Sequence, residues 1–270
     1  MVVFPNCKIN LGLHITRKRE DGFHDLETVF YPLPLRDALE VINSPLRGAQ
    51  FSSTGLPIAG DPAGNLCVKA YHLLKQDYPQ LPGVQIHLQK SIPMGAGLGG
   101  GSADGAFTLQ LLNRKYQLGI SEEQLMHYAL QLGSDCPFFI INKPAYAAGR
   151  GEKLQPVNLD LSAYTFVVIN PGIHVSTGQA FSLITPQPAP VTLSTIIQQP
   201  VQSWRGVLTN DFEAPVMQLH PELLTLKKQL YNAGAIYAAM SGSGSTFFGI
   251  FEKKSEIKIS TPSHYLTLTI

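Results

Sequence analysis

A run of glycines between a predicted strand and a predicted helix constrains this chain more than any other feature. Residues 84–89 (VQIHLQ) alternate apolar and polar side chains as a strand does, whereas residues 103–116 have a helical pattern. Between them, PMGAGLGGGS holds five glycines within seven residues. Glycine permits positive φ and close backbone approach, so these amides and those opening the helix can converge on one anion. The segment predicts a phosphate-binding loop; a tight turn without a ligand is the alternative.

Two well-known nucleotide motifs do not describe this loop. The P-loop pattern requires a lysine after its last glycine, and none follows here. The spacing G-x-G-x-x-G does occur, as Gly95, Gly97 and Gly100. A dinucleotide fold, however, needs an acidic residue about 20 positions on, at the end of a second strand. At that distance the S-x-x-Q pattern of 121–124 opens a helix instead, so nicotinamide or flavin binding ranks low.

Composition excludes several classes of function. Lys and Arg total 20 against 19 Asp and Glu, so there is no basic field for a nucleic-acid backbone. The three cysteines, Cys7, Cys67 and Cys136, lack zinc-site spacing, and their odd number argues against a disulfide framework and favours a reducing compartment. We find neither a signal-peptide pattern nor an apolar run long enough to span a bilayer. We therefore expect a cytoplasmic protein whose partners include neither nucleic acid nor a membrane.

Strands and helices mix without a regular βαβ rhythm, which predicts an α+β fold of two lobes, residues 1–160 and 161–270. Strands are expected at 3–16, 26–33, 37–42, 84–89, 138–141 and 164–169, with two more around the SGSGS turn at 241–245. Helices are expected at 65–78, 103–116, 122–132 and 222–233. Segment 44–63 is interpreted as a hairpin with loops, and the proline-rich segment 184–202 as an irregular surface connection.

Three segments resemble the ordered motifs of the GHMP kinases, the superfamily of galactokinase, homoserine kinase and mevalonate kinase. PMGAGLGGGSAD, at 93–104, resembles the second motif; PNCKINLGLHI, at 5–15, is similar to the first; AAMSGSGSTFFGIF, at 238–251, is similar to the third. The resemblance implies the two-lobed GHMP kinase fold. Its N-terminal, ATP-binding lobe is ribosomal-protein-S5-domain-2-like, and its C-terminal lobe is a ferredoxin-like α/β domain. It also implies ATP with Mg²⁺ as the cofactor.

Further segments resemble one branch of that superfamily. DGFH at 21–24, GNL at 64–66, LGSDCPFF at 132–139 and TNDFE at 209–213 all agree with it, and the match runs from about residue 5 to 250. Members of this branch use ATP to phosphorylate the 2-hydroxyl of 4-diphosphocytidyl-2-C-methyl-D-erythritol, on the non-mevalonate route to isoprenoid precursors. The resemblance thus implies a small-molecule partner that bears a cytidine diphosphate group.

The resemblance implies catalytic roles for Lys8 and Asp135. A carboxylate can accept the proton of the attacking hydroxyl. An ammonium nearby favours the charged carboxylate and offsets charge on the transferring phosphoryl group. The implied ATP-binding residues are Asn65, Lys90, Pro93, Met94, Gly95, Ala96, Gly97, Leu98, Gly99, Gly100, Gly101, Ser102 and Ala103. Asn65 also has the sequence context of a helix N-cap, and the two roles are compatible.

The substrate contacts implied by the resemblance are Asn10, Phe23, His24, Thr177 and Phe181. His24 aligns with the residue that reads cytosine. Phe23 stands where the family often has tyrosine. Phenylalanine lacks the hydroxyl but keeps an aromatic face on which the base can stack. Phe181 is the candidate for the opposite face of the base.

Two other functions stay open from the sequence: a GHMP kinase acting on mevalonate, homoserine or a sugar, and a nucleotide-binding module without turnover. The metal ligands and the oligomeric state are also left open.

Overall fold

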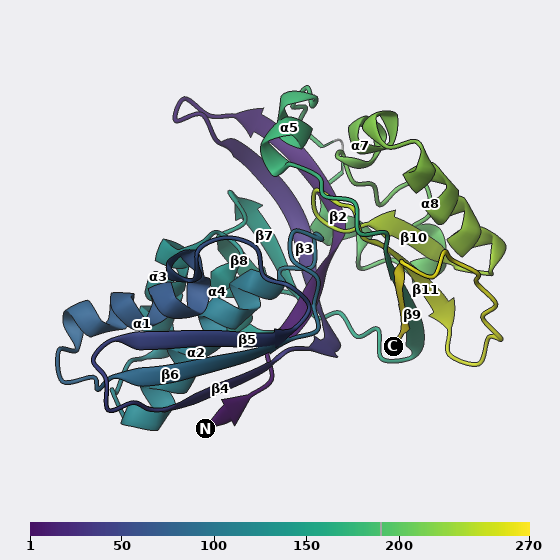
Figure 1. Cartoon of the computed structure of the whole chain (residues 1–270). Coiled ribbons are helices and arrows are strands. Elements are labelled where there is room, and N and C mark those ends of the chain that lie inside the picture. Colours follow the sequence, from purple (N-terminus) through teal and green to yellow (C-terminus); the bar gives the residue numbers. More distant parts are fainter. Residues whose placement is uncertain (190) are drawn as a thin grey trace. The chain divides into compact units, whose positions relative to one another are not determined.

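The protein, described by a computed structural model over residues 1–189 and 191–270, mixes α and β structure (Figure 1). Its contacts define two compact units. The first unit comprises Met1–Cys7, Pro32–Met94 and Gly99–Lys143; the second comprises Lys8–Tyr31, Gly95–Leu98 and Pro144–Ile270. The division near residue 160 stays a prediction. No helix in the described part of the chain is long and apolar enough to cross a bilayer.

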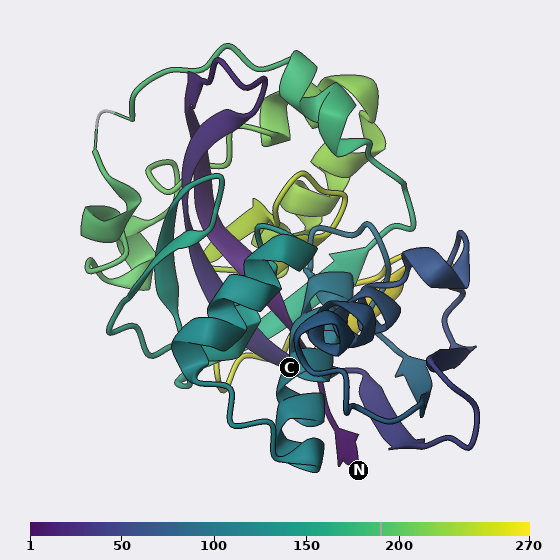
Figure 2. The same cartoon turned by 90° about the vertical axis from the view of Figure 1, so that its left-hand side faces the viewer.

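The first unit is a four-stranded sheet with helices packed against it. The sheet has the order β1 (Val2–Val3), β4 (Ala38–Asn43), β6 (Val84–Lys90), β5 (Ala49–Gly55). Its helices are α1 (Leu66–Asp77), α2 (Gly100–Tyr116), α3 (Glu122–Leu132) and α4 (Cys136–Ile141), with a short 3₁₀ turn, η1, at Pro62–Gly64. Figures 1 and 2 show α1 and α2 side by side, and both contact the sheet. In β6, Val84, Ile86 and Leu88 are buried, as the predicted alternation requires.

The start of α1 confirms the helix and the N-cap predicted there. The Asn65 side-chain oxygen accepts a hydrogen bond from the Cys67 amide at 2.9 Å. The capping box at Ser121 and Gln124 is also present, with both reciprocal hydrogen bonds made.

Two predicted elements of the first unit are wrong. The hairpin expected within 44–63 does not form, because the segment contains one strand, β5, which pairs parallel with β6. Parallel neighbours need a long crossover connection, and α1 provides it. The expected strand at 138–141 is helical instead, as part of α4. A short apolar run buried on every side does not distinguish a strand from a helix.

The second unit contains two further sheets. One has the order β2 (Asn6–Lys18), β3 (His24–Arg36), β7 (Ala145–Gly149), β8 (Lys153–Pro156), with 8–18 of β2 and 24–31 of β3 belonging to this unit. The other is wholly antiparallel, with the order β10 (Tyr237–Met240), β11 (Phe247–Glu252), β9 (Tyr164–Asn170), β12 (Leu266–Thr269). The helices are α5 (Thr177–Ser182), α6 (Leu193–Ile196), α7 (Glu213–Leu219) and α8 (Glu222–Asn232), with a 3₁₀ turn, η2, at Val201–Ser203. Side chains of α8, β9 and β11 meet in its hydrophobic core.

Candidate active site

The glycine-rich loop joins β6 to α2 through a series of left-handed residues. Gly95, Gly97 and Gly99 adopt φ of +63°, +76° and +69°, a region that favours glycine. Gly99 is the N-cap of α2, and because glycine has no side chain, it supplies no capping group to the first amides of the helix. The first amides of a helix have no intrahelical acceptor, so this end of α2 suits an anion. Of the predicted ATP-binding residues, Gly95–Leu98 belong to the second unit and the others to the first.

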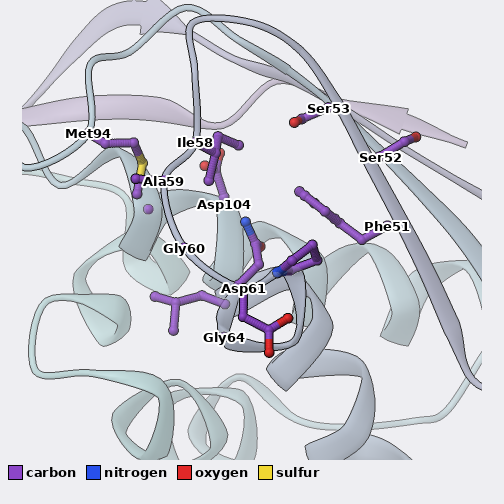
Figure 3. Close-up of a pocket in the computed structure, with 14 residues that line it drawn as sticks. Phe51, Ser52, Ser53, Ile58, Ala59, Gly60, Asp61, Gly64, Met94 and Asp104 are labelled. Atoms are coloured by element: carbon purple, nitrogen blue, oxygen red, sulfur yellow. The ribbon is translucent and has the colours of Figure 1, made fainter.

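A pocket of about 410 Å³ lies in the first unit beside the start of α2 (Figure 3). Figure 3 shows Phe51 and Met94 on opposite sides of it. Of the predicted ATP-binding residues, Asn65, Met94 and Gly101 line this pocket. Its volume suits a small organic ligand, and its mixed apolar and polar lining is typical of such sites.

Lys90 is buried at the end of β6 in a cluster with two carboxylates. Its Nζ lies 2.5 Å from Asp37 Oδ2 and 2.6 Å from Asp104 Oδ2, and all three side chains are almost fully buried. Asp37 Oδ1 also accepts from the amides of Ser91 and Ile92, the first residues of the loop. Asp104 belongs to the start of α2. The cluster therefore connects the start of this helix with the end of β6 and the first residues of the loop. Sequence reasoning missed Asp37, which carries no local signal.

This cluster holds two carboxylates against one ammonium. Burial lowers the pKa of Lys90, but the charges of Asp104 and Asp37 raise it more, so the pKa of Lys90 lies above its usual value. Burial raises the pKa of Asp104 to about 7; the charge of Lys90 opposes that rise and Asp37 adds to it. Lys90 therefore stays charged, while Asp104 is the group that titrates near neutral pH.

We expect Asp104 to make the protein less stable as the pH rises from about 4 to about 7. A carboxyl group with a folded-state pKa above its unfolded value binds its proton more tightly when folded. Its contribution is then greatest below the unfolded pKa and is lost as the pH passes the folded pKa. Urea unfolding at pH 5 and pH 8 measures this, with Asp104→Asn as the comparison. An equal change with pH in both proteins would contradict the expectation.

Asp135 is the N-cap of α4, directly after the turn that follows α3, and it is half-buried. The next residue, Cys136, is buried, and its thiol hydrogen-bonds with the side chain of Ser102 in the first turn of α2. Burial raises the pKa of Cys136 to about 12, so the thiol stays protonated. The first unit therefore brings Ser102 to the residue next to Asp135.

Lys8 lies in the second unit, at the centre of a buried polar network. Its Nζ donates to Asn10 Oδ1 at 2.6 Å and to the Gly97 carbonyl at 3.4 Å. It also lies over the Phe30 ring, 4.8 Å from the centroid. The Ser241 hydroxyl donates to the same Gly97 carbonyl at 2.8 Å. Residues of all three predicted motifs thus meet at Gly97. Lys8 and Asn10 are two positions apart on β2, so their side chains share one face of the strand.

Gly97→Ala should destabilise the protein strongly, because two effects add. Residue 97 has φ of +76°, and an added Cβ would lie 2.0 Å from the Ser241 carbonyl oxygen. Gly119→Ala is the matched control, since Gly119 has φ of +74° with nothing within 4 Å. We expect about 1 kcal/mol of destabilisation at Gly119 from backbone strain alone and clearly more at Gly97, measured by urea unfolding. Equal losses would mean that the packing of residue 97 against Ser241 is unimportant.

Apart from Asn10, the predicted substrate residues of the second unit make three different contacts. His24 stacks on Phe181, with ring centroids 4.7 Å apart and an interplanar angle of 16°. Phe23 is half exposed, and the Arg150 guanidinium lies 3.7 Å from its ring centroid. Thr177 Oγ1 lies 3.1 Å from Ser243 Oγ in the SGSGS turn. The structure thus brings His24 together with Phe181, whereas the ring contact described for Phe23 is with Arg150.

Two family models match the chain. The GHMP kinases N terminal domain matches residues 65–143, and the GHMP kinases C terminal domain matches residues 197–259. Among solved structures, a mevalonate kinase that is 11% identical matches with a TM-score of 0.72, covering 95% of this chain and 93% of that one. At that identity the likeness shows the fold alone, a mixed α+β GHMP kinase fold with N- and C-terminal domains.

Relatives with higher sequence identity show to which family of GHMP kinases the chain belongs. A 4-diphosphocytidyl-2-C-methyl-D-erythritol kinase from Bacteroides fragilis is 52% identical over 259 residues, 95% of this chain and 94% of the relative. The kinase of that name from Bacteroides thetaiotaomicron is 49% identical with the same coverage. A crystal structure of 4-(cytidine 5'-diphospho)-2C-methyl-D-erythritol kinase matches with a TM-score of 0.78 at 35% identity, covering 93% of this chain and 90% of that one. The chain therefore belongs to the 4-diphosphocytidyl-2-C-methyl-D-erythritol kinase family of the GHMP kinases.

Proposed function

We propose that this protein transfers the γ-phosphoryl group of ATP to the 2-hydroxyl of 4-diphosphocytidyl-2-C-methyl-D-erythritol, in non-mevalonate isoprenoid precursor biosynthesis. The observation that carries the proposal is the 52% identity to a kinase of that name over 95% of the chain. The glycine-rich connection and its helix start are consistent with a triphosphate ligand. The protein would act in the cytoplasm, with the domains divided at residue 160.

In this proposal Asp135 accepts the proton of the attacking hydroxyl, and Lys8 offsets the charge that develops on the transferring group. Asn10 orients the acceptor. Positioning and electrostatics supply most of the rate, because phosphoryl transfer asks for little covalent chemistry from a protein. The buried ammonium of Lys90 supports the loop through Asp37 and Asp104.

Mg²⁺ is proposed as the companion of ATP, where it would offset the negative charge of the triphosphate. The chain offers a hard oxygen donor of the kind that Mg²⁺ prefers, the Ser102 hydroxyl. Within residues 1–189 and 191–270, no three His, Cys, Asp or Glu side chains are grouped to hold a metal.

Recognition of the acceptor is assigned to the second unit. His24, Phe23 and Phe181 would bind the cytosine, with Thr177 as a further contact. The stack of His24 on Phe181 supports this assignment, because it brings together two of the residues assigned to the cytosine.

A panel of acceptors with ATP tests the proposed function. We expect a high kcat/KM only with 4-diphosphocytidyl-2-C-methyl-D-erythritol, and little turnover of mevalonate, homoserine or a hexose. Preference for one of those acceptors would identify a different GHMP kinase. Intact ATP in the presence of every acceptor would identify a nucleotide-binding module.

A further inference from the structure

A buried polar chain in the second unit runs from the main chain of β2 through Thr28 and Asn10 to Lys8. Thr28 lies on β3, and the other residues lie on β2. We propose that Thr28 is a positioning residue for phosphoryl transfer: its hydroxyl orients the Asn10 amide, which in turn holds the Lys8 ammonium in place. The functional part of this inference rests on the proposed kinase activity.

The direction of each hydrogen bond follows from what each group can donate. The Thr28 hydroxyl oxygen lies 2.6 Å from the Gly12 carbonyl oxygen, which can only accept, so the single hydroxyl proton is used there. The Thr28 oxygen is then left to accept from Asn10 Nδ2 at 3.0 Å. That contact turns Asn10 Oδ1 toward Lys8 Nζ, which can only donate and lies 2.6 Å away.

The backbone at Gly12 fixes the position of the carbonyl that accepts from the Thr28 hydroxyl. Gly12 has φ of +69°, and an added Cβ would lie 2.7 Å from Leu208 and 2.8 Å from Leu193 side-chain atoms. The residue is therefore confined to glycine in this packing, and its carbonyl is held where Thr28 needs an acceptor.

Because this site is buried, the orientation of the Asn10 amide has a large effect on its energy. Lys8, Asn10 and Thr28 are 3%, 2% and 0% exposed. An Asn10 amide turned the other way would direct its NH₂ group at the ammonium and its oxygen at the Thr28 hydroxyl oxygen. Away from water, an unmet donor or a charge facing a donor is costly. The Thr28 hydroxyl therefore favours the orientation in which Asn10 Oδ1 accepts from Lys8 Nζ.

Ser241, the other hydroxyl beside Asn10, does not perform this task. Its oxygen accepts from the Asn10 main-chain amide at 3.2 Å, and its proton goes to the Gly97 carbonyl at 2.8 Å. The longer contact from Ser241 to Asn10 Oδ1, at 3.5 Å, competes for that same proton. Among these contacts, only Thr28 engages the amide nitrogen end of the Asn10 side chain.

The test compares Thr28→Val, Thr28→Ser and a control, Thr108→Val. Thr108 is also fully buried, and its hydroxyl also donates to a main-chain carbonyl, that of Asp104, at 2.7 Å. We expect Thr28→Val to lower kcat about tenfold or more with the ATP KM within about twofold. Thr28→Ser should stay near wild type. Thr108→Val should lose a comparable amount of thermal stability and keep its kcat.

A second measurement does not depend on turnover. In ¹⁵N-labelled protein, the side-chain NH₂ of Asn10 should exchange slowly with solvent in the wild type and in Thr28→Ser, and much faster in Thr28→Val. Unchanged exchange in Thr28→Val would overturn the proposed orientation. Wild-type kcat in that variant, an equal kcat loss in Thr108→Val, or failure of Thr28→Ser to retain activity would overturn the positioning role. If the wild type does not phosphorylate the cytidyl acceptor, the proposed function fails, and the exchange measurement still decides whether Thr28 orients Asn10.

Discussion

Replacing Asp135 with asparagine should lower kcat for phosphoryl transfer by about a thousandfold, while the affinity for ATP stays within about threefold. Asparagine keeps the size of the side chain and removes its ability to take the proton of the hydroxyl. Steady-state kinetics with ATP and 4-diphosphocytidyl-2-C-methyl-D-erythritol give kcat, and equilibrium titration with an ATP analogue gives the affinity.

We expect this substitution to leave the fold intact, because asparagine has the shape of aspartate and keeps an oxygen that can accept hydrogen bonds. Asp135 stands at the N-cap of α4 but makes no capping hydrogen bond with its side chain. The neighbouring Cys136 is buried and engaged by Ser102, which holds the backbone at this point. The melting temperature should therefore stay within a few degrees of the wild type. A control variant, Asp160→Asn, changes an exposed carboxylate that accepts from the Ser162 amide, and it should keep full activity. Near-wild-type kcat in Asp135→Asn would remove Asp135 from the role of proton acceptor.

Replacing Lys90 with methionine should destabilise the protein by about 3–5 kcal/mol, the cost of removing one partner from a buried ion cluster. Methionine has a similar length but no charge, so Asp37 and Asp104 would face each other without a cation. Domains have only about 5–15 kcal/mol of stability in total, and part of the variant is therefore expected to unfold at 37 °C. Urea unfolding followed by circular dichroism measures the loss.

Two further variants separate charge from packing at this site. Lys90→Met combined with Asp104→Leu should recover a large part of the loss, because Asp37 would keep its hydrogen bonds from the Ser91 and Ile92 amides. Lys227→Met, which breaks the more exposed pair of Lys227 with Glu213, should cost about 1 kcal/mol or less. A Lys90→Met variant as stable as Lys227→Met would show that the buried cluster contributes little.

Features with a local signature were predicted correctly from the sequence. The alternation in β6, the N-cap at Asn65 and the capping box at Ser121 each depend on residues a few positions apart. The positive φ angles of the glycine-rich loop follow from residue type in the same way. The three ordered motifs similarly led to the GHMP kinases, with which the family models agree.

The errors arose where a segment's partner lies far away in the chain. The apolar run at 138–141 suits a strand or a helix equally, and its helical form depends on burial against the rest of the first unit. Segment 44–63 was interpreted as a hairpin from its content of Pro, Gly and Ser, whereas its strand, β5, pairs with β6, beyond α1.

The chain's local patterns were thus sufficient for its class of fold, the left-handed glycines of its loop and its family, because each of these is encoded in short-range spacing. The hydrogen-bond partners inside the site were not encoded in that way. Asp37 meets Lys90 across 53 positions, and Ser241 meets Gly97 across 144. Such contacts form only when folding excludes water from both groups and leaves each buried polar atom to find a partner among those the fold brings near it.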